Sequence, residues 1–496
     1  MLGALSHVFD SNKSVTAKIR RKEKPILISA DLISFFVSYS IGMLAYFWAQ
    51  TKDAANLELA EQSLSDPQIL LYVTLAMLSI AWMWNMGHYS RRKPFWDEVK
   101  ETCKVISILA LIDAALLLLA QIPISRLSFL LTWITALITI PLLRTGCKKI
   151  LIRAGKWQLP TVIIGAGTNA KETAAALHAE NLMGYDITTF LALPHETIPE
   201  EGFIELQDRC VPTIRLSERP FQTIQELGNP NIVIALDNGD LNHQLHLVNE
   251  LHRKNGNVSV VPSFRGLPLY GMETRHFFRH EVLFLEMRNN LSRQGPKLVK
   301  RFFDITASFF LLTILSPLLS FIAYQVKKDG GPAIYRHRRV GQNGEFFDCY
   351  KFRSMDINAE RKLKELLASS EDARKEWEKD FKLKKDPRIT KIGRFLRKSS
   401  LDELPQLLNV LKGEMSLVGP RPIVSEEVAR YGEQKAFYLE TKPGITGLWQ
   451  ISGRNDVDYK SRVNLDVWYV KNWSLWYDVV ILLKTIRVVL NKAGAY

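Results

Sequence analysis

Cysteine is scarce in this chain of 496 residues, and two familiar sequence signals are missing. The four cysteines lie far apart, without CxxC or CxxH spacing, which argues against a zinc site and a disulfide framework. Residues 1–25 are polar and basic, so the sequence predicts no cleavable signal peptide. No nucleic-acid recognition motif accompanies the formal net charge of +14, so we expect no nucleic-acid partner.

The positive charge is concentrated in one stretch. Residues 297–400 contain 24 lysines and arginines against 13 aspartates and glutamates. Because the chain also has long apolar segments, this excess favours an anionic membrane surface or phosphorylated substrates as partners.

Four apolar runs, at residues 26–49, 69–89, 103–122 and 127–143, are long enough to span a bilayer. Buried soluble helices are the alternative, and four runs in succession disfavour it. The N-terminal tail is basic, the first loop is acidic, and Arg144 and Lys148 are among the cations that follow the fourth run. The positive-inside rule therefore predicts a membrane bundle over residues 1–150 with both ends in the cytoplasm.

A fifth apolar run covers residues 302–326 and has basic residues on both sides. A spanning helix would place one basic cluster on the wrong side of the membrane. Ser316 and Pro317 lie in its middle, and proline favours a kink. We therefore expect a re-entrant helix that breaks at Ser316–Pro317 and returns, with a plain fifth span as the alternative.

Residues 151–295 are predicted to form a Rossmann-like α/β domain with a linker. A buried strand at 161–164 is followed by GxGxxA at 165–170 and a helical stretch, and further strands are expected near 187–193, 231–235 and 258–261. The acidic residue expected after the second strand to hold the ribose hydroxyls is missing, since the chain reads Leu193-Pro194-His195-Glu196 there, and the segment has no Tyr-x-x-x-Lys pair. Structure or regulation is therefore favoured over catalytic use of a dinucleotide.

Cations gather on a predicted hairpin in the last segment. Strands are expected at 333–340 and 346–352, with Lys351 and Arg353 at the end of the second strand. This pattern suits a phosphate-rich ligand better than a solvated edge. A charged helical arm follows at 357–385, and the aromatic tail at 465–490 predicts either interfacial helices or soluble core helices.

The sharpest local feature is the acidic pair Asp402–Glu403. Ser400 and Glu403 have capping-box spacing, and the leucines from 401 to 411 recur with helical period. The pair is thus expected in the first turn of a helix, close to Arg397. Capping alone is one interpretation; the other is that the carboxylates hold Mg²⁺ or attack phosphorus. Downstream, Arg421 stands in a Pro/Gly loop that predicts a fixed anion-binding position.

The order of motifs in residues 296–496 resembles the bacterial polyprenyl-phosphate sugar-1-phosphate transferases, the monotopic phosphoglycosyl transferases. The matching motifs are Lys300-Arg301-x-x-Asp304, Lys351-Phe352-Arg353-Ser354-Met355, Ser400-Leu401-Asp402-Glu403-Leu404-Pro405-Gln406, Gly419-Pro420-Arg421-Pro422 and Gly494-Ala495-Tyr496. His337 stands where the hairpin motif usually has glutamine. Two further motifs, at 263–269 and 449–456, look most like members that transfer galactose-1-phosphate.

The resemblance implies a membrane α-helical bundle, a Rossmann-like domain and an α+β catalytic domain at 296–496. It implies transfer of hexose-1-phosphate, galactose-1-phosphate first, from a UDP-sugar to undecaprenyl phosphate at the cytoplasmic face of the bacterial inner membrane, releasing UMP. Asp402 would be the nucleophile, and Asp402 and Glu403 would bind Mg²⁺. Arg397, Arg421, Lys351 and Arg353 would bind phosphate. The implied partners also include membrane lipid, a second copy of the chain and downstream glycosyltransferases of O-antigen, capsule or exopolysaccharide synthesis.

Three alternatives remain at this stage. The same reaction could use UDP-glucose, because no residue visibly reads the sugar. A non-catalytic membrane scaffold that senses nucleotides would not need the intact acidic pair. A nucleotide-sugar oxidoreductase is disfavoured by the missing Tyr-x-x-x-Lys.

Overall fold

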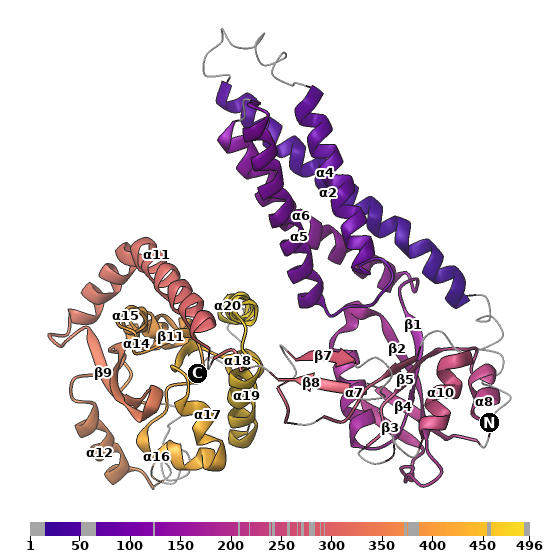
Figure 1. The fold of residues 1–496 in the computed structure, drawn as a ribbon. Coiled ribbons are helices and arrows are strands. Elements are labelled where there is room, and N and C mark those ends of the chain that lie inside the picture. The colour runs from indigo at the N-terminus through magenta and orange to yellow at the C-terminus, as the bar shows by residue number, and fades with distance from the viewer. Residues whose placement is uncertain are drawn as a thin grey trace. The chain divides into compact units, whose positions relative to one another are not determined.

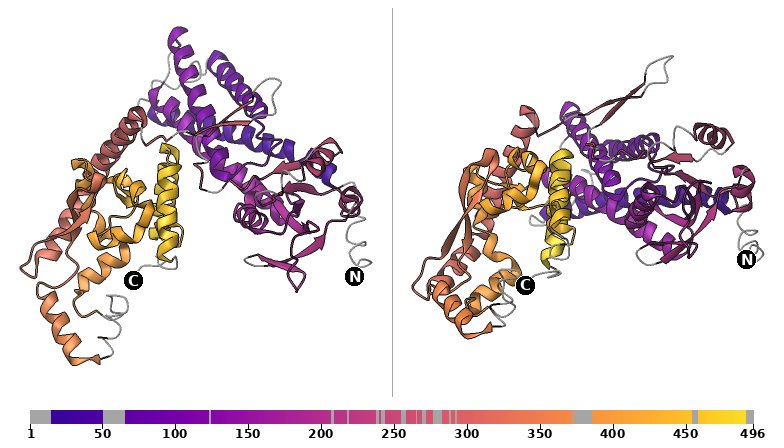
Figure 2. Two further views of the ribbon diagram at one scale, coloured as in Figure 1. Left: turned by 60° about the horizontal axis from the view of Figure 1, so that its bottom comes forward. Right: turned by 90° about the horizontal axis from the view of Figure 1, so that it is seen from below.

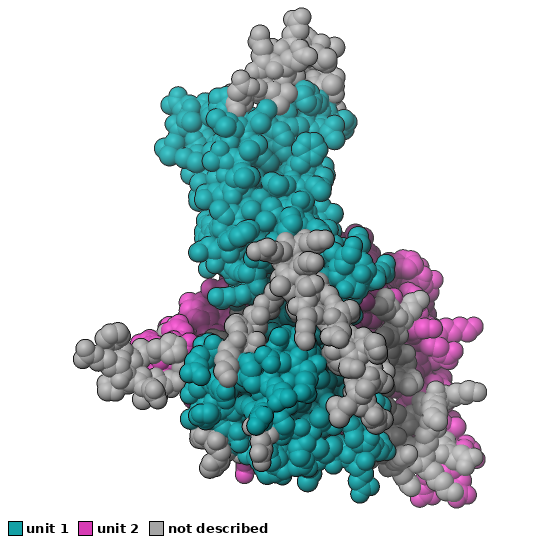
Figure 3. Space-filling model, turned by 90° about the vertical axis from the view of Figure 1, so that its right-hand side faces the viewer, with its two compact units in different colours: residues 1–265 teal, residues 266–496 magenta. Residues whose placement is uncertain are grey.

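The computed structural model forms two compact units, residues 1–265 and 266–496, which Figure 3 distinguishes by colour. The described residues are 15–50, 66–122, 125–206, 209–217, 219–237, 240, 244–254, 258–264, 266–268, 272–276, 283–287, 289–291, 293–371, 374, 386–453 and 458–490. The predicted boundaries at 150 and 295 stay predictions.

The first unit begins with four long helices: α2 (Val15–Gln50), α4 (Asp66–Asn85), α5 (Phe95–Leu119) and α6 (Arg126–Arg153). They lie side by side (Figures 1 and 2). Each contains a stretch long and apolar enough to cross a membrane, so the four predicted apolar segments are confirmed as helices.

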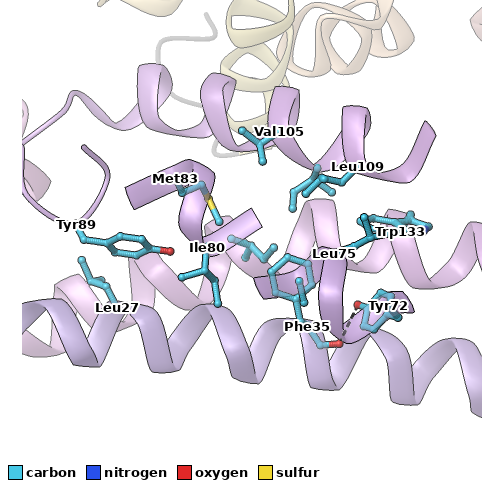
Figure 4. Close-up of a cluster of buried hydrophobic side chains, with 14 of the residues drawn as sticks. Leu27, Phe35, Tyr72, Leu75, Ile80, Met83, Tyr89, Val105, Leu109 and Trp133 are labelled. Carbon is cyan, nitrogen blue, oxygen red and sulfur yellow. Dashed lines mark hydrogen bonds between the residues drawn. The ribbon is translucent and has the colours of Figure 1, made fainter. Parts of the chain in front are cut away.

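These four helices share one apolar core (Figure 4). Met83 of α4 and Leu109 of α5 are fully buried in it, and the Tyr72 hydroxyl donates to the Phe35 carbonyl oxygen at 3.0 Å. Large apolar side chains such as Leu118 face outward instead. An apolar exterior around an apolar core suits a lipid environment.

Helix α6 is longer than the predicted apolar run because two of its basic residues are buried inside the bundle. Arg144 donates to both carboxylate oxygens of Asp31 at 2.6 Å, and Lys148 is ion-paired with Glu98. A buried charge is tolerated when a partner and hydrogen bonds are supplied. The expectation that Arg144 and Lys148 follow the fourth helix is therefore wrong, because compensated charges let the helix continue through them.

The rest of this unit alternates strands and helices: β1 (Leu159–Ile164), α7 (Thr168–Ala179), the 3-10 turn η2 (Asn181–Met183), β2 (Tyr185–Ala192), β3 (Phe203–Leu206), β4 (Arg209–Arg215), α8 (Pro220–Glu226), β5 (Asn231–Ile234), α10 (Leu245–Lys254) and β6 (Val258–Val260). The sheet order is β3-β4-β2-β1-β5-β6; β3 pairs antiparallel with β4, and the other pairings are parallel. One apolar cluster packs α7 on one face, and another packs α8 and α10 on the opposite face. The expected α/β region is thus present, with a mixed sheet.

The second unit begins with the antiparallel pair β7 (Glu273–His276) and β8 (Leu283–Glu286), followed by the 34-residue helix α11 (Gln294–Lys327). Helix α11 is bent (Figure 1). Pro317 has no N–H for the Thr313 carbonyl oxygen, and the Ser316 hydroxyl donates to that oxygen instead, at 2.8 Å. This pair provides a physical cause for a bend.

Both ends of α11 pack against the rest of the second unit. Near its start, the Lys300 ammonium group donates to Asp478 at 2.6 Å. Near its end, Ile322 and Val326 are buried in a cluster that includes the β9–β10 hairpin. Between them, large apolar side chains such as Phe309 are exposed.

The remaining elements are β9 (Ile334–Val340), η3 (Gln342–Gly344), β10 (Phe346–Phe352), α12 (Ala359–Ser369), α14 (Lys391–Ser399), η4 (Leu401–Glu403), α15 (Gln406–Lys412), β11 (Ser416–Val418), α16 (Ser425–Val428), η5 (Ala429–Gln434), α17 (Lys435–Leu439), β12 (Gly444–Thr446), α18 (Leu448–Ile451), α19 (Tyr459–Lys471) and α20 (Leu475–Leu490). The predicted antiparallel hairpin is confirmed as β9–β10, and β11 pairs with β12 in parallel. The charged arm is confirmed as a helix over α12, and most of its remainder lies outside the described residues.

The aromatic tail is divided between the core and the surface. Tyr469 and Trp473 are buried in the main apolar cluster of the second unit, as the core interpretation predicted. Ile486 and Leu490 of α20 are exposed, which suits the interfacial interpretation for the last turns. The motif residues 454–456 and 494–496 lie outside the described residues.

Candidate active site

Asp402 and Glu403 lie in a short 3-10 turn between two helices. Ser400 ends α14 in the left-handed region with φ of 56°, η4 carries the two acids, and α15 starts after Pro405. The expected helix from residue 401 with a Ser400–Glu403 capping box is wrong, since Ser400 makes no side-chain cap hydrogen bond. Pro405 has no N–H for the Leu401 carbonyl oxygen, so the chain turns with i to i−3 bonds before an α-helix begins.

Two cations of the predicted site approach this turn from different elements. Lys351 at the end of β10 donates to Glu403 at 2.6 Å. The Arg397 side chain of α14 donates from Nε to the Ser354 hydroxyl at 2.9 Å, which leaves the rest of the guanidinium group for another acceptor. The hairpin and α14 therefore fix the position of positive charge beside the acidic pair.

The electrostatic setting makes Asp402 an unusual carboxyl. The pKa of Asp402 is raised from 3.8 to about 6, first by burial and then by the neighbouring Glu403 charge, against the lowering effect of Lys351 and Arg397. Four of the predicted site residues thus act on one another. A carboxylate that is partly desolvated and flanked by cations is suited to react with an anionic phosphate.

Arg421 enters this region from the Pro/Gly loop after β11. The loop is fixed because the Gly419 N–H donates to the Thr446 carbonyl oxygen at 2.9 Å and the Gly444 N–H donates to the Pro420 carbonyl oxygen at 2.8 Å. The Arg421 guanidinium carbon lies 5.5 Å from the Trp449 ring centre, a cation–π distance.

Arg421 also shares an electrostatic neighbourhood with the acidic turn. Burial raises the pKa of the Cys349 thiol to about 11, and the charges of Lys351, Glu403 and Arg421 all act on that thiol. Lys351, Glu403 and Arg421 are therefore all within electrostatic range of this one β10 side chain.

The structure places Arg353 elsewhere. Its guanidinium group contacts both carboxylate oxygens of Asp329 and donates to the backbone carbonyl oxygens of Val326 at 3.0 Å and Pro332 at 2.8 Å. These contacts fasten the end of α11 to the hairpin. The phosphate-binding role of Arg353 stays a prediction, and the geometry gives this side chain a structural task.

Asp466 of α19 supports the Arg421 loop and could not be identified from the sequence. This buried carboxyl accepts from the Tyr431 hydroxyl at 2.9 Å, and both the backbone N–H and the charge of Arg421 act to lower its pKa. Burial raises its pKa to about 7. Its only sequence signal is a single acidic residue in an apolar helix face of α19, which is too common a pattern to identify a supporting residue.

The Lys300-Arg301-x-x-Asp304 motif holds α11 to the unit. Arg301 donates to the carbonyl oxygens of Val410 at 2.5 Å and Leu411 at 2.8 Å, near the end of α15. The Asp304 carboxylate accepts from the Leu417 N–H at 3.1 Å. The motif thus fixes α11, which is long and apolar enough to cross a membrane, against α15, the helix that follows the acidic turn.

A divalent metal ion has two adjacent carboxylates available here. Among the described residues, no group of three or more His, Cys, Asp or Glu side chains could hold a metal ion. Mg²⁺ often uses one or two protein carboxylates together with water and substrate phosphates. Asp402 and Glu403 therefore fit a magnesium ion that a diphosphate helps to bind.

Comparison with known proteins agrees with this geometry. The bacterial sugar transferase family matches residues 295–492, which include α11 and the acidic turn. The chain is 45% identical over 477 residues to "Undecaprenyl-phosphate galactose phosphotransferase" of Salmonella typhimurium, covering 95% of this chain and 97% of the relative. It is 42% identical over 433 residues to "UDP-galactose-lipid carrier transferase" of Erwinia amylovora, covering 87% and 89%.

A third relative, "Uncharacterized sugar transferase" of Haemophilus influenzae, is 42% identical over 469 residues, covering 94% of this chain and 97% of the relative. The similarity therefore extends over the helical bundle and the α/β region as well as the catalytic part. The chain belongs to the bacterial sugar transferase family, the polyprenyl-phosphate sugar-phosphate transferases, and is an enzyme.

Proposed function

We propose that this enzyme transfers hexose-1-phosphate, with galactose as the hexose, from a UDP-sugar to undecaprenyl phosphate. An Asp402 oxygen attacks the phosphorus that carries the sugar, and the bond from that phosphorus to the bridging oxygen breaks. UMP leaves with the bridging oxygen. An oxygen of undecaprenyl phosphate then attacks the same phosphorus, the Asp402–phosphorus bond breaks, and the carboxylate is restored.

The setting of Asp402 carries this proposal. With a pKa of about 6, the carboxyl is mostly ionised at neutral pH and remains a better nucleophile than a fully solvated, weakly basic carboxylate. Its attack on an anionic phosphate requires positive charge nearby. Lys351 and Arg397 supply that charge at the turn, and Arg421 would add to it from the Pro/Gly loop.

Asp402 and Glu403 would hold Mg²⁺ when it is bound, and that ion would neutralise charge on the donor diphosphate. Glu403 is positioned for this by Lys351, which keeps its carboxylate in one orientation. Arg397 would contact phosphate with the guanidinium nitrogens that Ser354 does not engage.

The membrane arrangement follows from α11. Its two ends pack against one compact unit, while the middle exposes large apolar side chains. A helix that crosses the bilayer would separate its ends by about 30 Å on opposite sides, which a single water-exposed unit does not bridge. This supports a re-entrant α11 that holds the active site at the headgroup level, and the basic flanks support a cytoplasmic face.

Galactose is the first expectation because the names of two long relatives refer to it. Glucose differs in the orientation of one hydroxyl group and is the alternative. The lipid-linked product would serve as the first sugar of an O-antigen, capsule or exopolysaccharide repeat unit, passed on to downstream glycosyltransferases. A homodimer remains part of the proposal.

UMP release tests the reaction. The full chain, purified in detergent, is supplied with Mg²⁺, undecaprenyl phosphate and either UDP-galactose or UDP-glucose, with Asp402→Asn as the control. Release with UDP-galactose that is lost in the variant supports the proposal, and release with UDP-glucose alone corrects the sugar. Undiminished release by Asp402→Asn would remove Asp402 as the nucleophile.

Cysteine labelling tests the membrane arrangement separately. A cysteine at position 327, at the end of α11, should react with a membrane-impermeant reagent from the cytoplasmic side only. Labelling from the periplasmic side would establish a fifth span.

A further inference from the structure

The glycine-rich loop of the α/β region has the sequence and the position of a dinucleotide-binding loop. It connects β1 to α7, and β1 has β2 on one side and β5 on the other. The chain passes from β1 to β2 on one side and later returns to β5 on the other, which makes this edge a topological switch point. In dinucleotide-binding domains, the N–H groups of this loop and of the helix start bind a pyrophosphate.

Here those N–H groups already have acceptors from the same chain. The Ala166 N–H donates to both carboxylate oxygens of Glu196, each at 3.1 Å. The Thr168 N–H donates to Asp237 at 3.1 Å, and the Asn169 N–H donates to the other Asp237 oxygen at 2.8 Å. Two carboxylates therefore take the donors that a pyrophosphate would need.

The two acids come from opposite sides of β1. Glu196 follows β2 and also accepts from the Leu193 N–H at 2.7 Å, which fixes its loop. Asp237 follows β5. The His195 ring and the Asp240 carboxylate are in hydrogen-bond contact at 3.0 Å, which joins the two loops. The carboxylates are thus held in place by the fold and do not depend on an incidental side-chain orientation.

The glycines are explained by this internal packing. A Cβ atom at Gly167 would lie 2.0 Å from an Asp237 carboxylate oxygen, and one at Gly165 would lie 2.5 Å from the Ala235 carbonyl oxygen. Gly165 also has a φ of +120°, which side chains rarely adopt. The close approach that these glycines permit is used by the chain itself.

We infer that the β1–α7 loop is a self-occupied anion site, in which Glu196 and Asp237 replace the diphosphate that the loop pattern implies, so that the folded domain binds no dinucleotide there. A diphosphate would have to displace two carboxylates and would meet their negative charge. The residues present therefore do not fit the cofactor that the loop sequence suggests. This inference does not depend on the proposed transferase reaction.

Amide hydrogen exchange of residues 166–169 tests the inference in the full chain in detergent. Probes are NADH and inorganic pyrophosphate, each compared with chloride at matched ionic strength. In the unaltered protein, neither probe should change the exchange of these amides. Slower exchange at residues 166–169 with either probe would overturn the inference.

Asp237→Asn tests whether the loop binds pyrophosphate once the carboxylate charge is gone, because this variant removes the charge while keeping an acceptor oxygen. The amides of residues 168 and 169 should exchange about tenfold faster, the loss expected for a charge-assisted hydrogen bond. Pyrophosphate should then restore slow exchange. If the amides of this variant speed up but do not respond to pyrophosphate, the loop is not an anion site and the inference fails.

Asp186→Asn is the matched control. Asp186 lies in the same domain and pairs with Arg209 at 2.8 Å on the surface, so it carries the same charge without a loop contact. This variant should leave residues 166–169 unchanged with and without pyrophosphate. Should Asp237→Asn fail to fold, Glu196→Gln is read at the Ala166 amide with the same expectations. UMP release by the same preparations reports the transferase reaction independently.

Discussion

The first half of the reaction is expected to slow about tenfold as the pH falls from 7 to 5. Asp402 attacks only as a carboxylate, and its pKa is raised from 3.8 to about 6, first by burial and then by the Glu403 charge. A group with that pKa is about 90% ionised at pH 7 and about 10% ionised at pH 5. A carboxyl with the ordinary value would stay above about 90% ionised over the same range. Activity is therefore present above the raised pKa and is lost as the pH falls through it.

The assay is single-turnover UMP release without undecaprenyl phosphate. Leaving out the acceptor removes the titration of its own phosphate from the profile. Lys351→Gln serves as a directional control, because Lys351 lowers the pKa of Asp402 and its removal should move the midpoint to higher pH. A rate that stays flat down to pH 5 would refute the argument that burial and Glu403 set the ionisation of the nucleophile.

Three further predictions separate chemistry from structure. Raising the Mg²⁺ concentration should move the pH midpoint of UMP release downward, because a metal ion held by carboxylates favours their ionised form. An unchanged midpoint would argue against Asp402 and Glu403 as the metal ligands. Lys351→Ala should lower UMP release about 100-fold and change the unfolding free energy by less than about 1 kcal/mol. Arg353→Ala should instead lower the unfolding free energy by about 2–4 kcal/mol in denaturant, because its carbonyl and carboxylate partners lose their donor. The reverse pattern would restore Arg353 as a phosphate ligand. Lys300→Met should destabilise the second unit by about 3–5 kcal/mol, since it leaves Asp478 buried without its cation, and unchanged thermal unfolding would contradict that anchoring role.

The apolar helices and the parallel core of the sheet could be predicted because their signals are local. Long apolar runs and buried strands followed by glycine turns depend on neighbouring residues alone. The strands β3 and β4 were missed because their pattern is mixed; Arg209 and Cys210 are exposed while Val211 is buried. The place of β4 is decided by pairing with β2 and that of β3 by pairing with β4, which no local pattern reveals.

The acidic pair could be identified from its spacing, but its backbone conformation could not. Ser400 and Glu403 match a capping box, yet Pro405 two residues further on denies the helix a hydrogen bond and forces a tight turn. Arg353 shows a different limit. Its position in a motif beside Lys351 suggested a shared task, but Arg353 follows the end of β10 at Phe352, where the regular strand geometry stops. Lys351 reaches Glu403, and Arg353 reaches Asp329.

Charge patterns were also ambiguous without three-dimensional partners. Arg144 and Lys148 were counted as flanking cations, but Asp31 and Glu98 compensate them inside the bundle. Those partners lie 113 and 50 positions away in the chain. Sequence reasoning therefore identified which residues carry charge but could not decide which of them are paired.

The central claim is that Asp402 carries the phosphosugar, and the most direct test is to trap it. The full chain is mixed with Mg²⁺ and a UDP-sugar labelled in the sugar-linked phosphate, without undecaprenyl phosphate, and the protein is digested and analysed by mass. The account predicts label on the peptide that contains Asp402, its loss on addition of undecaprenyl phosphate, and no label in Asp402→Asn that is otherwise folded. Label on a different residue, or UMP release without any labelled protein, would contradict it.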